Sequence, residues 1–279
     1  MRERPVTSLA ALAADAHAGF PSRAGTPRVR RARAALAAAL WRRDGSRRLP
    51  SERALDEALR ALPEAELAWV CEFAPLGPLY LLPTRRFVGA LARKVIALGA
   101  RRVVEVAAGD GFLSAALQRA LPEVEVIATD SGAWARPEAR MTPKERRAHA
   151  KHAVPGVRAG PHMRRMGALR AVEELAPDLV LASWLPPGTL LDRLIRSKTR
   201  YVLEVGAAGD VTAGPWSWRF AHDTCEGTLE EAARCRLDAR PSRRLHSRVT
   251  LYFGRSHEEH RCERVRPGDW LWQFRPSRA

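Results

Sequence analysis

Beyond residue 100, apolar segments of strand length alternate with amphipathic segments of helix length, and this alternation constrains the fold more than any other feature. We expect strands at residues 103–106, 124–129, 162–166, 178–183, 201–205, 237–239 and 248–253. Helices are expected between them, including 113–121, 141–152, 190–196 and 228–236. Strands that alternate with helices are typical of an α/β chain with a doubly wound, mostly parallel sheet.

The first 82 residues show helical patterns without strands, and they predict a basic α-helical N-terminal extension. Val29, Ala32, Leu36 and Leu40 recur at spacings of three and four within residues 28–43, which indicates an amphipathic helix. Further helices are expected at 51–62 and 84–98, with an apolar, proline-broken helical cap at 67–82 between them. The predicted organisation is an extension (1–82), an α/β domain that contains the strands (83–255) and a basic aromatic tail (256–279).

Positive charge is concentrated in particular segments of the chain, whose formal net charge is +16. Residues 1–60 hold 13 basic and 6 acidic side chains, and residues 234–279 hold 12 and 5. An insertion at 131–160 adds 7 basic and 2 acidic side chains, whereas the stretches between these segments are close to neutral. Localised basic charge fits an anionic partner such as a nucleic acid, although solubilising ends explain it equally simply.

The composition excludes several classes of protein. No run of about 18 uninterrupted apolar residues is present, so a membrane span is not expected. The alanine-rich start is a poor signal-peptide core, and the four cysteines contain no CxxC pair, so we expect a cytoplasmic protein with reduced thiols. His257 and His260 are three residues apart rather than four, and no metal site is predicted.

The segment VVEVAAGDGFLS at residues 103–114 has the pattern of a strand, a glycine loop and a helix. Glycines are required where backbone approaches a ligand closely, and a helix N-terminus supplies free N–H groups. A dinucleotide and S-adenosylmethionine are both candidate ligands for such a loop. The fingerprint of dinucleotide-binding loops has a third glycine, which lets the helix pack closely on the strand. Ser114 stands at that position here, so the match is imperfect.

Read as acidic-x-Gly-x-Gly-x-Gly with Ala107 in place of the first glycine, the loop resembles that of class I S-adenosylmethionine-dependent methyltransferases, which are Rossmann-like. The resemblance covers residues 83–254 and includes an acidic residue after the second strand and an antiparallel seventh strand. It departs at Gly167, where the family commonly has Asp, and at the prolines after the fourth strand. It implies S-adenosylmethionine as cofactor, bound by Glu105, Ala107, Gly109, Asp110, Gly111, Asp130, Ser131, Gly167, Ala168 and Ser183.

The acceptor of the methyl group is expected between the loops that follow the fourth and fifth strands, because the first two strands already face the cofactor. The residues assigned to substrate binding are Trp184, Pro186, Trp216 and Trp218. Residues 216–220 and 270–274 each alternate aromatic side chains, which would place three rings on one face of an extended segment. No catalytic base is assigned.

Two functions follow from these observations. The first is a methyltransferase that acts on a small-molecule or nucleic-acid acceptor. The second is a non-catalytic Rossmann-like module that binds RNA or another polyanion through its basic ends. The departures at Ala107 and Gly167 keep the second hypothesis open.

Overall fold

The computed structural model describes residues 25–72, 74, 78–133, 143, 159–160, 162–207, 212–213, 215–225, 227, 229–238 and 247–262. The predicted helix at 141–152 except for residue 143, the aromatic residues at 270–274, and most of the basic insertion therefore lie outside the described residues. None of the described helices is long and apolar enough to cross a membrane.

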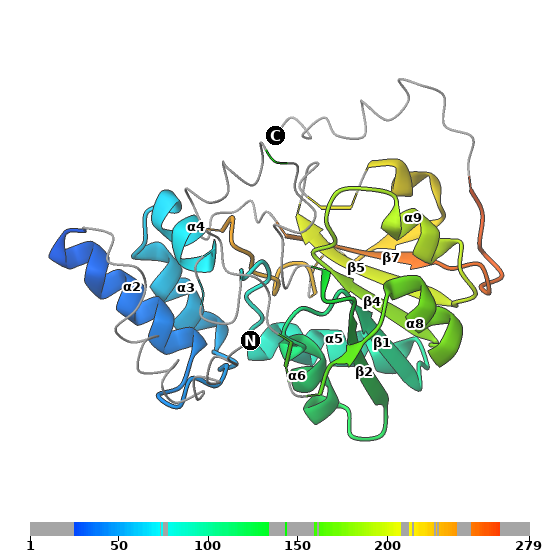
Figure 1. Cartoon of the computed structure of the whole chain (residues 1–279), viewed down its shortest axis with the longest axis horizontal. Helices are drawn as coiled ribbons and strands as arrows, with labels where there is room; N and C mark the ends of the chain where they lie inside the picture. Colours follow the sequence, from blue (N-terminus) through cyan, green and yellow to red (C-terminus); the bar gives the residue numbers. More distant parts are fainter. Residues whose placement is uncertain are drawn as a thin grey trace.

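The N-terminal extension forms a small helical unit beside the sheet (Figure 1). Helices α2 (Pro27–Leu40), α3 (Glu52–Arg60) and α4 (Glu64–Glu72) build it. Thr26 and Ser51 cap α2 and α3, since their hydroxyl groups accept hydrogen bonds from backbone N–H groups three residues later. The apolar faces share their own buried cluster, which includes Leu36, Leu55 and Leu67.

A seven-stranded sheet with the order β3-β2-β1-β4-β5-β7-β6 forms the rest of the molecule. Its first five strands pair in parallel, and β7 runs antiparallel to both β5 and β6. The bounds are β1 Arg102–Val106, β2 Glu125–Asp130, β3 Arg164–Arg165, β4 Leu179–Ser183, β5 Tyr201–Ala207, β6 His222–Thr224 and β7 Ser247–Phe253. The predicted α/β class, the mostly parallel sheet and the antiparallel seventh strand are confirmed.

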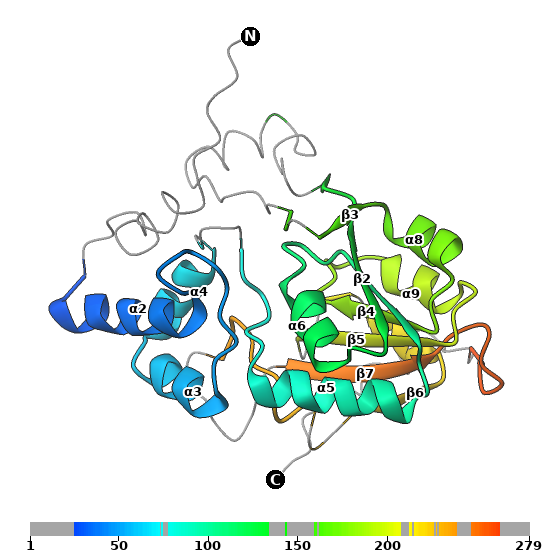
Figure 2. The ribbon, with the colours of Figure 1, turned by 90° about the horizontal axis from the view of Figure 1, so that it is seen from below.

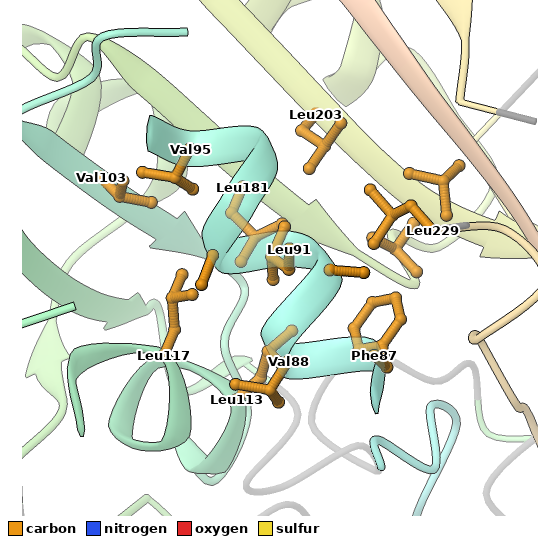
Figure 3. Packing of buried hydrophobic residues seen from close by; sticks show 14 of the residues in the cluster. Phe87, Val88, Leu91, Val95, Val103, Leu113, Leu117, Leu181, Leu203 and Leu229 are labelled. Carbon is orange, nitrogen blue, oxygen red and sulfur yellow. The ribbon is translucent and has the colours of Figure 1, made fainter. Parts of the chain in front are cut away.

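Helices cover both faces of the sheet, as expected for a doubly wound fold (Figure 2). Helices α5 (Arg85–Ala97) and α6 (Phe112–Ala120) pack on one face, and α8 (Ala168–Leu175) and α9 (Leu190–Ile195) pack on the other. Figure 3 shows Phe87, Leu91 and Val95 of α5 beside side chains of the central strands, which are fully buried. Because both faces are covered, the central strands are buried along most of their length, and they are apolar there except at Glu105 and Glu204.

Two predicted elements after β5 are wrong. The sixth strand is His222–Thr224, whereas the described residues 237 and 238 of the predicted strand 237–239 form no strand. The described part of 228–236 forms turns, irregular backbone and a β-bridge at Cys235 rather than a helix, although Leu229, Ala232 and Ala233 have helical spacing. These side chains are buried against the α5 face of the sheet, so tertiary packing explains the apolar spacing without a helix.

The turn segment at 229–238 joins the helical unit to the sheet. The Arg234 guanidinium pairs with Asp56 at 2.9 Å and with Glu52 at 2.9 Å, both on α3. The backbone N–H of Leu82 donates to the carbonyl of Arg234, and Leu81 forms a bridge with Cys235. The extension therefore packs directly on the sheet unit, and the division at residue 82 stays a prediction.

Candidate cofactor and acceptor sites

The glycine loop follows β1 and occupies the carboxyl end of the sheet. Its backbone is left-handed at Ala107 (φ 52°), Gly109 (φ 60°) and Gly111 (φ 72°). Glycine adopts this conformation without strain, whereas alanine does not. Ala107 therefore keeps the backbone geometry of the glycine that it replaces, and the loop closes onto the N-terminus of α6.

Glu105 lies beneath the loop rather than on its open side. Its carboxylate accepts hydrogen bonds from the Ser114 backbone N–H at 3.0 Å and the Ser114 hydroxyl at 2.6 Å. Burial disfavours the charged carboxylate and raises the pKa of Glu105 to about 7, against the lowering effect of the Ser114 hydrogen bonds. The structure thus gives Glu105 a role in holding the first turn of α6 in place.

Asp130 ends β2, as expected, and its side chain meets the glycine loop. One carboxylate oxygen accepts a hydrogen bond from the Gly109 N–H at 3.1 Å, and the other accepts one from the Gly132 N–H at 2.6 Å. Each oxygen retains a second lone-pair direction for a further donor. The adjacent Ser131 is exposed and its hydroxyl accepts a hydrogen bond from the Ala133 N–H.

The extension reaches into this site through Arg47, which the sequence reading missed. Its guanidinium pairs with the Asp110 carboxylate at 2.7 Å and lies 4.3 Å from the centre of the Phe112 ring. The Arg47 side chain is only 7% exposed, and its Nε has no hydrogen-bond partner among the described residues. Arg47 is one of eight arginines between residues 25 and 50, so its sequence context did not distinguish it.

The segment after β3 borders Asp130. The Met166 N–H donates to the Asp130 carbonyl at 2.8 Å, and Gly167 and Ala168 then begin α8. A Cβ at Gly167 would meet no atom within 4 Å, so the Asp found here in the family would fit. Gly160 was also missed: a Cβ there would lie 2.1 Å from the Asp110 carbonyl oxygen, which excludes any larger residue without movement.

The end of β4 carries a strained tryptophan. Trp184 follows Ser183 with φ 53°, and its N–H donates to the Val205 carbonyl at 2.7 Å. A positive φ is rare for a bulky residue and costs of order 1–3 kcal/mol, and such strain clusters at functional sites. The indole stacks on the Tyr80 ring at 5.6 Å, so the helical extension also contributes to this side of the site.

The loop after β5 is not extended, although the alternating aromatic residues at 216–220 would share one face only in an extended segment. Pro215–Arg219 form the 3-10 helix η3, and Phe220 is buried in the core, so the three rings do not share one extended face. Trp218 packs edge-on against His222 and lies under the Arg248 guanidinium at 4.5 Å. The Trp216 side chain lies outside the described residues. Substrate binding by Trp216 and Trp218 stays a prediction, as it does for the exposed Pro186.

A second buried acid lies in the middle of β5. Glu204 is 6% exposed, and its carboxylate accepts a hydrogen bond from the Thr212 hydroxyl at 3.4 Å. Burial raises its pKa to about 7, opposed by Thr212 and by the charge of Arg248. Neither buried glutamate was anticipated as a titrating group, because burial depth is not visible in the sequence.

Two titratable groups of the extension, Cys71 and the Tyr80 that stacks on Trp184, are poor bases at neutral pH. Burial raises the pKa of the Cys71 thiol to about 12 and also raises the pKa of the Tyr80 hydroxyl. Both groups therefore remain protonated near pH 7. Among the described residues, no group of three or more His, Cys, Asp or Glu side chains is arranged to hold a metal ion.

The electrostatics of the loop favour one class of ligand. The carboxylates of Glu105, Asp110 and Asp130 lie around it, and two of them already bind N–H groups of the first turn of α6. A pyrophosphate requires such N–H groups and would be repelled by the Asp130 carboxylate. A ligand with hydroxyl groups and a positive charge matches the arrangement instead.

The sequence matches no protein-family model, and no curated protein matches it. Solved structures with similar folds include the 23S rRNA methyltransferase ErmE (16% identity, 64% of this chain, 70% of that chain, TM-score 0.35). The plantazolicin methyltransferase BpumL covers 61% of this chain and 84% of its own at 10% identity and TM-score 0.33. The ribosomal protein L11 methylase of Lactobacillus delbrueckii subsp. bulgaricus covers 60% and 77% at 14% identity and TM-score 0.30. By its own strand order and antiparallel β7, the chain has the Rossmann-like fold of class I methyltransferases.

Proposed function

We propose that the chain is an S-adenosylmethionine-dependent methyltransferase. The observation that carries the proposal is the closure of a left-handed loop onto the acidic end of β2, with the Gly109 N–H bonded to Asp130 at 3.1 Å. This places a backbone that can approach a ligand beside a carboxylate that can accept hydrogen bonds from ribose hydroxyls.

The residues present fit S-adenosylmethionine better than a dinucleotide. Glu105 and Asp110 occupy N–H groups at the start of α6 that a pyrophosphate would need. The Asp130 carboxylate favours a ligand with a cationic sulfonium and a protonated amine, whereas the Asp110 carboxylate is already paired with Arg47. In this proposal Asp130 holds the ribose, residues 107–111 approach the methionyl part, and Gly167 and Ala168 border the adenine.

When bound, S-adenosylmethionine supplies an activated methyl group, which an acceptor nucleophile takes by in-line displacement at carbon. The chain contributes orientation and exclusion of water, which are the main protein contributions to such a step. Trp184 and Pro186, which follow β4, face the acceptor in this proposal, and Ser183 at the end of β4 faces the cofactor. Tyr80 joins them because its ring stacks on Trp184. The catalytic base stays unassigned.

A non-catalytic binding module is the second hypothesis, and its sequence support was the pair of departures at Ala107 and Gly167. Ala107 adopts the left-handed backbone of a glycine, and Gly167 leaves open space at the position of the common Asp. Neither departure obstructs the loop. The geometry therefore favours the methyltransferase.

The test is transfer of a radiolabelled methyl group from S-adenosylmethionine to fractions of a cell lysate, with and without nuclease treatment. We expect label in one fraction with the wild-type protein and much less label with Asp130→Ala at the same concentration of S-adenosylmethionine. Equal labelling by wild type and Asp130→Ala would contradict the assignment of the ribose site. Absence of label from every fraction, in a protein that binds S-adenosylhomocysteine, would support the binding module.

A further inference from the structure

Charge is separated within the helical extension. Residues 25–50, which form α2 and the turn after it, hold eight arginines and one acidic residue, Asp44. Residues 51–72, which form α3 and α4, hold two arginines and six acidic residues. A general arginine bias of the sequence would enrich all three helices, so this bias does not explain the separation.

The arginines of the first segment fall into two groups. Arg33 and Arg47 are largely buried and pair with Glu66 and Asp110. The other six are exposed, and none forms an ion pair with a carboxylate of the described residues. The six exposed arginines, here called the α2 basic surface, are Arg28, Arg30, Arg31, Arg42, Arg43 and Arg48.

The α2 basic surface is directed outward because the opposite side of the helix is apolar. Leu36 and Leu40 are buried in the core of the helical unit, whereas Ala34, Ala35 and Ala38 lie among the exposed arginines. The surface thus carries no large apolar side chain for insertion into a lipid layer, which interfacial helices require. It offers guanidinium groups, which bind phosphate through paired N–H donors.

This surface is connected to the proposed cofactor site. The turn at 42–48 begins at the C-terminal end of α2, the end nearer the sheet in Figure 1. Arg47 lies within this turn and pairs with Asp110 of the glycine loop at 2.7 Å. The exposed Arg42 therefore lies five positions before Arg47, which contacts the loop directly.

We infer that the α2 basic surface binds the phosphodiester backbone of a nucleic acid and that this nucleic acid is the methyl acceptor. The acceptor role rests on the proposed function, whereas the binding itself does not. A strand lying along α2 and the turn would be held by phosphate contacts at one end of the site. Its acceptor base would then reach the end of β4, where Trp184 and Tyr80 offer aromatic rings for stacking.

The test compares two charge-matched triple variants of the full chain. The first is Arg28→Gln/Arg31→Gln/Arg43→Gln on the α2 basic surface. The second is Arg93→Gln/Arg101→Gln/Arg119→Gln, three exposed arginines of the sheet unit that form no ion pair with described residues. Binding of a labelled 30-nucleotide RNA, and of DNA of the same sequence, is measured between 50 and 200 mM salt.

Loss of three phosphate contacts should reduce the slope of log affinity against log salt by roughly 2 in the first variant, at about 0.7 per contact for a single strand. The second variant should keep the wild-type slope. Tighter binding of RNA or of DNA identifies the acceptor class, and either supports the inference. Equal slopes in the two variants, or binding to anionic phosphatidylserine vesicles but to neither nucleic acid, would overturn it.

S-adenosylhomocysteine calorimetry on the same proteins separates the two proposals. Binding should be unchanged in both triple variants, because neither touches the glycine loop. If the wild type binds nucleic acid through α2 but does not bind S-adenosylhomocysteine, the surface stands and the proposed methyltransferase function fails. If the cofactor product binds and nucleic acid does not, the function stands and the inference fails.

Discussion

The two halves of the sheet's carboxyl edge are built differently. At the β1–β2 half, backbone and carboxylates make the site, and every carboxylate there already accepts a hydrogen bond: Glu105 from Ser114, Asp110 from Phe112 and Asp130 from Gly109. At the β4–β5 half, aromatic rings from distant segments make it, with Trp184 stacked on Tyr80. The first half is defined by local spacing, and the second by tertiary contacts.

This difference separates a general function from a particular one. A loop held by its own carboxylates can present the same backbone in many proteins, whatever the acceptor. The edge at Tyr80 and Trp184 depends on how the helical extension packs on the sheet. The extension therefore belongs to the specific part of the site, and each prediction below acts on one half more than on the other.

The largest effect is expected for Arg47→Met, which removes the contact between the extension and the glycine loop. The variant leaves Asp110 unpaired in a largely buried position, and breaking such a pair costs about 3 kcal/mol. We expect a lower free energy of unfolding in urea and weaker S-adenosylhomocysteine binding. Arg48→Met, one residue along and exposed, is the control and should change neither quantity.

A second prediction distinguishes the two halves by pH. Glu105 and Glu204 each have a folded-state pKa of about 7, above the ordinary value of 4.5, so between these pH values the folded chain binds more protons than the unfolded chain. Stability conferred by the protonated form is therefore complete below pH 4.5 and is lost as the pH rises toward 7. Each glutamate accounts for about 3 kcal/mol of this loss.

Urea unfolding at several pH values tests this predicted loss of stability between pH 4.5 and 7. Glu105→Gln and Glu204→Gln should each make the free energy of unfolding less dependent on pH across that window. Only Glu105→Gln should also weaken S-adenosylhomocysteine binding, because Glu105 holds the first turn of α6. An unchanged pH dependence in both variants would show that these carboxylates ionise at ordinary pH values in the folded chain.

The third prediction acts on the β4–β5 half alone. Trp184→Ala removes the indole that faces the acceptor in our proposal, and we expect methyl transfer to fall by roughly tenfold or more, a change of about 1.4 kcal/mol or more in the barrier. Cofactor affinity should stay within about threefold. Tyr80→Ala should have the same direction of effect, and Tyr80→Phe, which keeps the stacked ring, should not. Full turnover by Trp184→Ala would place the acceptor elsewhere.

The smallest effect is expected for Ala107→Gly. The left-handed backbone at φ 52° is strained by about 1 kcal/mol for alanine, and glycine relieves this strain. Glycine also raises the conformational entropy of the unfolded chain, which offsets part of the gain. We expect a change of less than about 1 kcal/mol in unfolding free energy and unchanged cofactor affinity, measured by thermal melting and calorimetry. A large gain in affinity would mean that Ala107 distorts the loop.

The sequence was informative where the structure depends on neighbouring residues. Strand and helix alternation, the glycine loop and the position of Asp130 follow from apolar runs and short spacings, and they are present as expected. Residues 229–233 are a case in which local spacing misleads. Their apolar side chains have the spacing of a helix, but they belong to a non-helical segment that packs on the core. Their backbone is fixed by contacts from elsewhere, including the pairs of Arg234 with α3.

The same limit applies to the site. Arg47 lies 63 residues before its partner Asp110, and Tyr80 lies more than 100 residues before Trp184. No local pattern marks either pair. The short polar strand β6 was missed for a related reason: it is stabilised by pairing with β7 rather than by its own apolar residues.

Calorimetric titration of the full chain with S-adenosylhomocysteine tests the central claim most directly. We predict saturable one-to-one binding by the wild type. Asp130→Ala should weaken it by roughly tenfold or more, because a hydrogen bond to a charged group contributes about 1.5 to 3 kcal/mol. Gly109→Val should also weaken it, whereas Gly99→Val, which places the same side chain at a similar left-handed φ of 64° at the end of α5, should not. Absence of binding by the folded wild type, or equal binding by wild type and Asp130→Ala, would contradict the account.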